Sequence, residues 1–371
     1  MTALENVLDG LTVQGELYEK LPGDANVVRC TACAHRCKIS PGKRGVCQVR
    51  FNLDGELRVP WGYVAALQAD PIEKKPFSHV YPGATALTFG MLGCDFHCGY
   101  CQNWLTSQAL RDPASNVALK LVRQIAPSEL VQVARRVKAD VIVSSYNEPL
   151  ITSEWAVAVF KEAKAAGLAC AFVSNGNATP EVLEYLRPYL SAYKVDLKSM
   201  QAKNYRSLGG VLQNVLDTIQ KAHDLGLWVE VVTLIVPGFN DSNEELFEAA
   251  RFLRSVSADI PWHVTAFHKD YKMTTPQNTP ADTLMRAAEL GREAGLHYVY
   301  AGNLPGRVEE YEDTHCPNCN QALIRRTGYV IQEYHLTSQG ACPSCGTHIA
   351  GVWPDDPKAV KLSGSGMPGV L

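Results

Sequence analysis

The spacing of its cysteines limits what this chain can fold into more than any other feature. Eleven of the twelve cysteines fall into three short groups, and Cys170 stands alone. The groups are Cys30, Cys33, Cys37 and Cys47; then Cys94, Cys98 and Cys101; then Cys316, Cys319, Cys342 and Cys345. Grouped thiols are typical of metal sites in a reducing compartment, where disulfides are rare. We therefore expect metal ligation at each group, and we expect Cys170, inside an apolar run, to be a buried small side chain.

Charge and the N-terminal sequence narrow the classes of function. Lys plus Arg number 35 against 38 Asp plus Glu, so no overall positive field attracts nucleic acid, and we do not expect it as a partner. The first twenty residues carry four acids and lack the basic and apolar regions of a signal peptide. No apolar run reaches the roughly 18 residues that span a bilayer. We expect a cytoplasmic protein without membrane segments.

Strand-like apolar runs alternate with helical patterns between the second and third cysteine groups. The strand candidates are residues 85–91, 141–145, 169–174, 193–197, 229–236, 263–267 and 298–301. Helix starts fit between them, at Thr179-Pro180 and at Ser242 followed by Glu245. Such alternation predicts an α/β fold of parallel β/α units, with chemistry at the carboxyl ends of the strands.

The central cysteine group follows the first of these strands directly. Cys94, Cys98 and Cys101 have the spacing C-x3-C-x2-C on one short loop. Three thiolates can hold three irons of a cubane cluster and leave the fourth iron open, whereas structural zinc needs four ligands. An open iron is a place to bind a substrate. The alternative is a zinc site whose fourth ligand comes from elsewhere in the chain.

This loop and the strand ends around it resemble the radical S-adenosylmethionine (SAM) superfamily, over about residues 85–305. The resemblance implies a [4Fe-4S] cluster on the three cysteines, SAM at its open iron, and Tyr100 beside the adenine. Residues 145–149 look like the Gly-Gly-Glu motif of these enzymes, with Tyr146 and Asn147 in place of the glycines. Asn147 and Glu148 would then meet the SAM amino group.

Further strand ends are similar to those of pyruvate formate-lyase activating enzymes. By this resemblance Ser174, Asp196, Lys198 and His268 would hold the ribose and the methionyl carboxylate, Asn175 would belong to the same site, and Ile235 would pack on the adenine. Some activases have a cation site with an Asp where this chain has Val173, so we expect no such site.

A narrower resemblance, to the AmmeMemoRadiSam radical SAM enzymes, runs over nearly the whole chain. It rests on residues 30–47, 70–76, 101–104, 146–149 and 266–271. It implies AMMECR-like and Memo-like proteins as candidate partners.

The outer cysteine groups are expected to bind metal independently of SAM. Two C-x2-C pairs around a strand-like run at 329–334 predict a zinc ribbon at Cys316, Cys319, Cys342 and Cys345. The N-terminal group lies in a basic stretch without acids and could hold zinc or an auxiliary cluster. We expect it to pack near the strand ends as a lid that offers cations such as Arg36 and Lys43 to an anionic substrate.

Together these features predict a partial (β/α) barrel of the radical SAM type with two flanking metal segments. The boundaries are 1–75 for the four-cysteine segment, 76–305 for the core and 306–371 for the zinc ribbon. Asp270 and Tyr271 follow a core strand and are the candidate catalytic residues for proton transfer or substrate binding, although a capped loop is an equal alternative.

The superfamily resemblance implies reductive cleavage of SAM to a 5′-deoxyadenosyl radical, which abstracts hydrogen from a substrate. A one-electron donor such as flavodoxin or ferredoxin would be needed. Glycyl-radical installation on a protein is the alternative reaction, and a zinc-ribbon nucleic-acid-binding protein is the alternative from another class.

Overall fold

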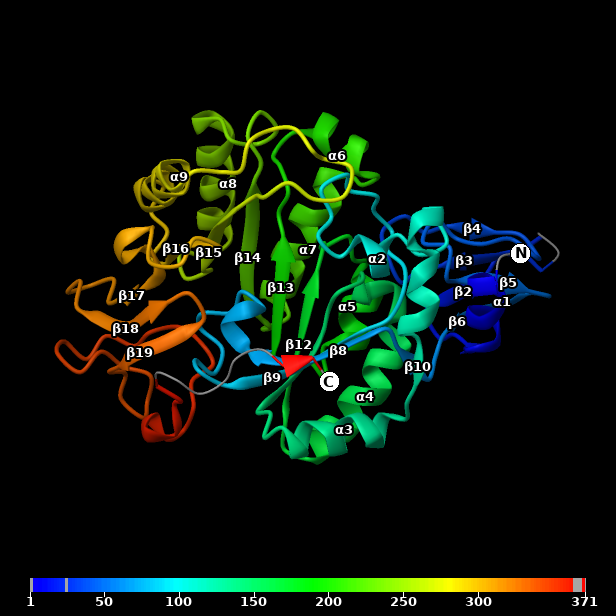
Figure 1. Cartoon of the computed structure of the whole chain (residues 1–371), viewed down its shortest axis with the longest axis horizontal. Helices are drawn as coiled ribbons and strands as arrows, with labels where there is room; N and C mark the ends of the chain where they lie inside the picture. Colours follow the sequence, from blue (N-terminus) through cyan, green and yellow to red (C-terminus); the bar gives the residue numbers. More distant parts are fainter. Residues whose placement is uncertain (1–2, 24–25, 363–368, 371) are drawn as a thin grey trace.

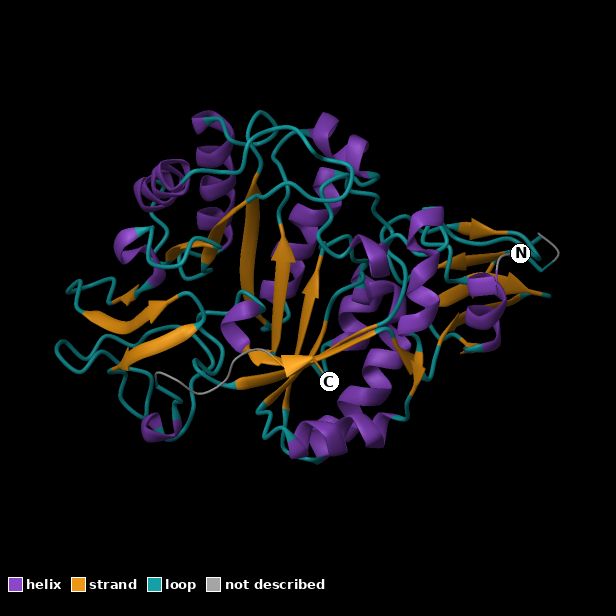
Figure 2. Cartoon of the chain, viewed as in Figure 1, coloured by secondary structure: helices purple, strands orange, loops and turns teal. Residues whose placement is uncertain are grey.

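The central element is a nine-stranded, mostly parallel sheet (Figures 1 and 2). The structure is a computed structural model and describes residues 3–23, 26–362 and 369–370. Seven neighbouring strands run parallel: β9 (Thr85–Gly90), β11 (Val141–Ser144), β12 (Ala169–Ser174), β13 (Ala192–Asp196), β14 (Trp228–Ile235), β15 (Trp262–Ala266) and β16 (Val299–Gly302). Each predicted strand is present to within one or two residues at either end. The α/β prediction is therefore confirmed, and Cys170 of β12 is buried as expected.

Helices between the strands form a layer on one face of the sheet. They are α3 (Pro127–Arg136), α4 (Ser153–Ala165), α5 (Pro180–Leu186), α7 (Leu212–Asp224), α8 (Asn243–Val256) and α9 (Ala281–Glu293). Helix α6 (Ala202–Leu208) instead packs on the loop after β9, where Leu208 O accepts a hydrogen bond from His97 N. The spatial order of the parallel strands follows the chain, so right-handed crossovers place their helices on the same side. Helices α3, α4, α5, α7, α8 and α9 accordingly contact one another in succession. On the opposite face, the segment 72–84 packs against residues such as Val141 and Ala171, while Val173, Lys194 and Val232 line a cavity.

Local sequence signals set the starts of two helices as predicted. The Thr179 hydroxyl accepts a hydrogen bond from Val182 N at 3.1 Å at the start of α5. The Ser242 hydroxyl accepts one from Glu245 N at 3.3 Å at the start of α8. The Glu245 carboxylate does not complete the capping box, because it accepts hydrogen bonds from the Ser199–Gln201 turn instead.

Two strands outside the predicted core extend the sheet. Strand β8 (Ala66–Pro71) pairs antiparallel with β9, and β20 (Gly369–Val370) pairs antiparallel with β8. Strand β8 was not predicted, because its residues lack a clean apolar alternation and end in Asp70-Pro71. The 3-10 turn η1 (Ile72–Lys74) follows it directly.

The N-terminal region packs at one end of the long axis of the molecule (Figure 1). Its elements are α1 (Ala3–Gly10), β1 (Thr12–Gln14), β2 (Tyr18–Lys20), β3 (Val28–Cys30), β4 (Lys38–Ile39), β5 (Phe51–Leu53), β6 (Glu56–Pro60) and β7 (Tyr63–Val64). Arg50 links this region to α4, because it donates two hydrogen bonds of 2.7 Å to the Glu154 carboxylate. Both side chains are buried, at 1% and 2% exposure.

The C-terminal region, residues 306–362, lies at the other end and bridges two parts of the core. Its elements are η4 (Glu309–Glu312), β17 (Thr314–His315), β18 (Ala322–Thr327), β19 (Val330–Tyr334) and η5 (Pro357–Ala359). Turn η4 contacts β16, while Tyr81 N, after β8, donates to Val352 O at 2.8 Å. Arg326 also donates to Ser78 O at 2.8 Å. The region therefore joins β16 at one edge of the sheet to the segment that follows β8.

The remaining short elements surround the strand ends. They are α2 (Trp104–Ser107), η2 (Pro113–Leu121), β10 (Arg123–Gln124) and η3 (Pro149–Thr152). Within the described residues no helix has the length and apolar character needed to cross a bilayer.

Candidate active site

The central cysteine loop begins where β9 ends, at a position that only glycine fits. Gly93 has φ of +99°, and a Cβ there would lie 2.9 Å from the Val49 side chain. The chain then turns sharply into Cys94. Phe96 N donates to Cys94 Sγ at 3.3 Å, and the Ser107 hydroxyl lies 3.1 Å from Cys101 Sγ. These contacts hold the sulfur atoms in fixed directions.

The environment of these thiols suits metal ligation. Burial raises the pKa of Cys98 to about 12 and raises that of Cys94 and Cys101 as well. Lys198 opposes this rise at Cys98 and Cys101. A thiolate at such a buried position needs more positive charge than one lysine supplies, and a bound iron provides it. The three residues fit the cluster that their spacing predicts.

Two of these cysteines open into a cavity of 360 Å³, here called the inner cavity. Tyr100, Asp196 and Lys198 line it together with Cys98 and Cys101, so the structure brings these predicted residues together. Burial opposes ionisation of Asp196, but Lys194 and Lys198 outweigh it and lower its pKa to about 2. The inner cavity therefore holds a permanent carboxylate between two ammonium groups.

Other predicted cofactor residues form a second, fully buried group beside Cys94. The Ser174 hydroxyl and Asn175 N each donate to the Glu148 carboxylate at 2.7 Å. Asn175 Nδ2 lies 2.7 Å from Asp95 Oδ1 and 4.0 Å from Cys94 Sγ. Burial and the nearby Asp95 raise the pKa of Glu148 to about 8. These side chains do not line the inner cavity in this structure.

Asn147 and Ile235 have supporting positions. Asn147 Oδ1 accepts from Met91 N at 2.9 Å and so ties the end of β11 to the end of β9. Ile235 is fully buried, and its carbonyl accepts from the Thr279 hydroxyl at 2.6 Å.

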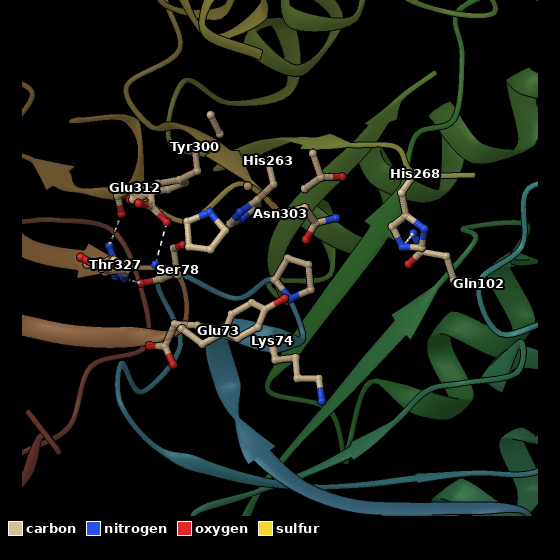
Figure 3. A pocket seen from close by; sticks show the side chains of 18 residues that line it. Glu73, Lys74, Ser78, Gln102, His263, His268, Tyr300, Asn303, Glu312 and Thr327 are labelled. Atoms are coloured by element: carbon tan, nitrogen blue, oxygen red, sulfur yellow. Dashed lines mark hydrogen bonds between the residues drawn. The ribbon is translucent and has the colours of Figure 1, made fainter. Parts of the chain in front are cut away.

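A larger cavity of 530 Å³, the outer cavity, adjoins the inner one (Figure 3). The two share the lining residues Lys74, Pro76, Gln102, Thr265, Asn303 and Tyr329. His268 lines the outer cavity, with its Nε2 2.8 Å from Gln102 Nε2, rather than the inner cavity with Asp196. Thr327, Gly328 and Tyr329, at the turn between β18 and β19, close it from the C-terminal side. The C-terminal region thus forms a wall of the site.

Asp270 and Tyr271 line neither cavity. The Tyr271 hydroxyl donates to Asp112 at 2.5 Å, and its ring stacks on Trp104 at 5.2 Å. Asp270 Oδ1 accepts from Tyr271 N, and Lys272 N donates to Gly99 O at 3.0 Å. These contacts of Asp270, Tyr271 and Lys272, here called the clamp, hold the loop after β15 against the cysteine loop. This arrangement corresponds to the capped loop that was the alternative to a catalytic role.

Comparison with known proteins supports what this geometry indicates. The model of the radical SAM superfamily matches residues 89–253, which include the cysteine loop and strands β11 to β14. The chain contains a radical SAM superfamily domain over these residues. It is an enzyme of that class, and membership implies a [4Fe-4S] cluster and SAM as cofactors.

Similarity to individual proteins extends beyond this core. An uncharacterized protein of Methanocaldococcus jannaschii is 38% identical over 335 residues, covering 90% of this chain and 97% of the relative. A pyruvate formate-lyase-activating enzyme of Staphylococcus aureus is 25% identical over 203 residues, covering 51% of this chain and 78% of the relative. The solved structure of a radical SAM methyltransferase from Sphaerobacter thermophilus has a TM-score of 0.47 at 16% identity, over 60% of this chain and 68% of that one.

The C-terminal cysteines of this radical SAM enzyme form a compact four-thiol site. Within the described residues this is the one group whose ligand atoms all lie within 4.8 Å of one another. Cys316 and Cys345 Sγ are 3.5 Å apart, and Cys319 and Cys342 Sγ are 3.7 Å apart. Tetrahedral bonds of about 2.3 Å place two sulfurs about 3.8 Å apart, so the geometry fits one metal ion.

The N-terminal cysteine segment lies against the outside of the cysteine loop. Arg111 donates both to Val46 O at 2.6 Å and to Cys94 O at 3.0 Å. The His35 ring meets the Phe96 ring edge-on at 6.3 Å. The segment is thus beside Cys94, as expected, but none of residues 30–47 lines either cavity.

The expectation that Arg36 is a free cation for a substrate needs correction, whereas the same role for Lys43 stays a prediction. Acids from other parts of the chain pair with its arginines: Arg29 with Glu19, Arg36 with Glu181, Arg44 with Glu5 and Asp9, and Arg50 with Glu154. The segment has a net positive charge when it is considered alone, because the acids that pair with its arginines lie outside it in the sequence.

Sequence reasoning missed the charged residues of the Asp70–Lys75 segment and the tip of the C-terminal hairpin. Glu73, Lys74 and Lys75 line the cavities, as do Tyr146 and Tyr329. The available signal was the presence of four charges in six residues around a proline. That pattern normally predicts a solvent-exposed turn. Only the folded structure shows that these charged side chains line the cavities.

Glu73 gives the fold a distinctive pH dependence. Burial raises its pKa to about 7, and its Oε2 has no hydrogen-bond partner within the described residues. A carboxyl whose pKa is higher in the folded state stabilises least at high pH, so stability falls as pH rises from about 4.5 to about 7. We expect the free energy of unfolding of Glu73→Gln to fall by about 2 to 3 kcal/mol less than that of wild type over this pH range.

Urea unfolding of both proteins at about pH 5 and about pH 8 measures this difference. Glu162→Gln, at an exposed position of α4, is the matched control and should keep the wild-type pH dependence. A decline that is equally steep in Glu73→Gln would show that Glu73 is not its source.

Proposed function

We propose that this enzyme cleaves SAM at a [4Fe-4S] cluster held by Cys94, Cys98 and Cys101 and abstracts hydrogen from a substrate bound in the outer cavity. The observation that carries the proposal is the junction of the two cavities, one at the cysteines and one walled by the C-terminal hairpin. The chemistry supplied at this loop is one-electron reduction of the SAM sulfonium, which releases methionine and a 5′-deoxyadenosyl radical.

The residues of the chain prepare the inner cavity for this chemistry. Asp196 and Lys198 offer opposite charges to the ammonium and carboxylate groups of the methionyl moiety. Tyr100 is buried against Phe239, with ring centroids 5.9 Å apart, and gives the adenine an apolar neighbour. The clamp around Tyr271 holds the cysteine loop in place through the hydrogen bond from Lys272 N to Gly99 O.

Activation of a glycyl-radical enzyme is the second candidate function. The similarity to the activating enzyme of Staphylococcus aureus favours it, although that similarity covers half of this chain. We favour a different substrate, because the tip of the C-terminal hairpin forms one wall of the outer cavity and takes up space that a large protein loop would need. A flavodoxin or ferredoxin as electron donor and a Memo-like or AMMECR-like partner are part of this proposal.

Anaerobic incubation of reconstituted protein with SAM and a reductant tests the proposal. We expect 5′-deoxyadenosine, and with the true substrate we expect deuterium transfer from labelled substrate into it, measured by mass spectrometry. A glycyl-radical EPR signal on an added protein would favour the activase. If no 5′-deoxyadenosine forms, the proposed reaction is wrong.

We further propose that the C-terminal four-thiol site binds zinc. Protein purified without added metal should contain about one zinc per chain at this site, and Cys316→Ser/Cys319→Ser should lose it because two ligands are removed. Elemental analysis measures the content, with Cys170→Ala, a buried cysteine of β12, as the control that retains zinc. Full zinc in the double variant, or iron in place of zinc, would contradict this assignment.

A further inference from the structure

We propose that Lys74 and Lys75, held by Asp70, form an oxyanion-binding subsite where the substrate presents a carboxylate or a phosphate group. This inference rests on the proposed function and specifies the chemical class of its substrate. None of the sequence patterns assigned a role to these residues.

The subsite is built at the end of β8. Strand β8 ends at Pro71, and the η1 turn brings both lysines back to Asp70. Lys74 Nζ lies 2.9 Å from Asp70 Oδ1, and Lys75 Nζ lies 2.7 Å from Asp70 Oδ2. Lys75 Nζ also donates to the Tyr146 hydroxyl at 2.8 Å and lies 4.7 Å from the centre of its ring. Lys74, Lys75 and Tyr146 all line the inner cavity, and Lys74 also lines the outer cavity, so the subsite lies where the two cavities meet.

The charges in this subsite do not balance. One carboxylate, with no exposed side-chain surface, faces two ammonium groups, and the Lys75 side chain is only 4% exposed. Burying an ammonium group away from water costs folding free energy unless an anion pairs with it. Burial lowers the pKa of Lys75 to about 8, which is the expected sign of this cost. A bound oxyanion would restore the balance.

The extra positive charge of Lys74 and Lys75 is not needed to offset the negative charge of the cysteine thiolates. Cys98 and Cys101 line the inner cavity together with Lys194, Asp196 and Lys198. Lys198 and Lys194 share Asp196 at the end of β13, so a separate lysine and carboxylate group serves that part of the cavity. Lys74 and Lys75 are therefore available for a second ligand.

Hydrogen-bond donors are also in surplus. An ammonium group has three N–H donors. Lys75 uses two of them, on Asp70 and the Tyr146 hydroxyl, and Lys74 uses one, on Asp70. The Tyr329 hydroxyl, on the C-terminal hairpin, makes no hydrogen bond within the described residues. Tyr329 lines both cavities together with Lys74, so the hairpin tip lies beside the subsite. Several free donors and net positive charge are the features that bind oxyanions.

Calorimetric titration of the reconstituted, SAM-loaded enzyme with inorganic phosphate and with succinate tests the subsite. We expect at least one probe to bind, and the preferred probe identifies phosphate or carboxylate as the group. Lys75→Met should weaken binding by roughly tenfold or more, because a charge-assisted hydrogen bond is lost. Lys75→Arg keeps the charge and should bind within about threefold of wild type.

Matched controls separate this effect from misfolding. Lys221→Met changes a lysine on α7 that pairs with Glu184 on the surface, and it should bind the probe as wild type does. If Lys75→Met fails to fold, Lys74→Met, whose side chain is 31% exposed, replaces it and should also weaken binding. Absence of binding to wild type, or equal binding by the lysine-to-methionine variants and wild type, overturns the subsite.

The same preparations distinguish failure of the subsite from failure of the proposed function. If wild type forms 5′-deoxyadenosine but binds the probes independently of Lys75, only the subsite is wrong. If probe binding depends on Lys75 but SAM is never cleaved, the proposed reaction is wrong and the anion site stands.

Discussion

Replacing Cys98 with alanine is expected to abolish SAM cleavage. Cys98 is buried, lines the inner cavity and supplies one of three thiolates on a loop that has no spare cysteine. Loss of a residue that only supports a metal ligand costs about 10- to 100-fold in affinity or activity, so loss of a ligand should cost more than about 100-fold. Iron and sulfide analysis should show a depleted cluster, and chromatography should show no 5′-deoxyadenosine above background.

Cys170→Ala is the matched control for this experiment. Cys170 is also fully buried, but it lies within β12 and away from both cavities. Its alanine variant should keep the wild-type iron content and rate of SAM cleavage. If Cys98→Ala cleaved SAM as fast as wild type, the three-cysteine assignment would be wrong.

Arg50→Met is expected to cause the largest loss of folding stability among the substitutions of charged residues. Glu154 is buried, and its carboxylate accepts from Arg50 and from the backbone N–H groups of Glu16 and Leu17. Without Arg50 an uncompensated charge stays in the interior, which typically costs about 3 to 5 kcal/mol. Urea unfolding monitored by circular dichroism should show a loss of free energy of unfolding of that size.

Two comparisons identify the buried charge as the cause. The double variant Arg50→Met/Glu154→Leu removes both charges and should recover most of the lost stability. Arg29→Met breaks an ion pair whose side chains are 41% and 53% exposed and should cost less than about 1 kcal/mol. A double variant as unstable as Arg50→Met would assign the effect to lost packing instead.

The Arg50 and Glu154 pair also has a definite pH dependence. Burial raises the pKa of Glu154, but Arg50 outweighs burial and lowers it below the usual value. A carboxyl with a lowered pKa in the folded state stabilises above its unfolded pKa and loses this contribution as pH falls. The difference between wild type and Arg50→Met should therefore shrink at acidic pH.

The sequence predicted those parts of the fold that depend on neighbouring residues. Continuous apolar runs such as Val141–Ser144 indicated the parallel strands, because both faces of these strands are covered. The Thr179 cap and the Cys94 to Cys101 spacing are local patterns as well. In each case the residues that set the structure lie within one element or one loop.

The features that the sequence did not reveal depend on contacts between distant residues. Arg50 and Glu154 are 104 positions apart, and Lys75 and Tyr146 are 71 apart. No local pattern indicates that an arginine in a basic stretch is neutralised or that a lysine in a charged turn faces a cavity. The contact of the C-terminal hairpin with the site likewise depends on how the region packs across the core.

EPR spectroscopy of the reduced, reconstituted protein with and without SAM tests the central claim most directly. If SAM binds the open iron of a cluster on Cys94, Cys98 and Cys101, its addition changes the EPR spectrum of the reduced cluster, and 5′-deoxyadenosine accumulates in the same sample. A reduced cluster whose spectrum is unchanged at saturating SAM, with no 5′-deoxyadenosine formed, would contradict the assignment of this loop as the SAM-cleaving site.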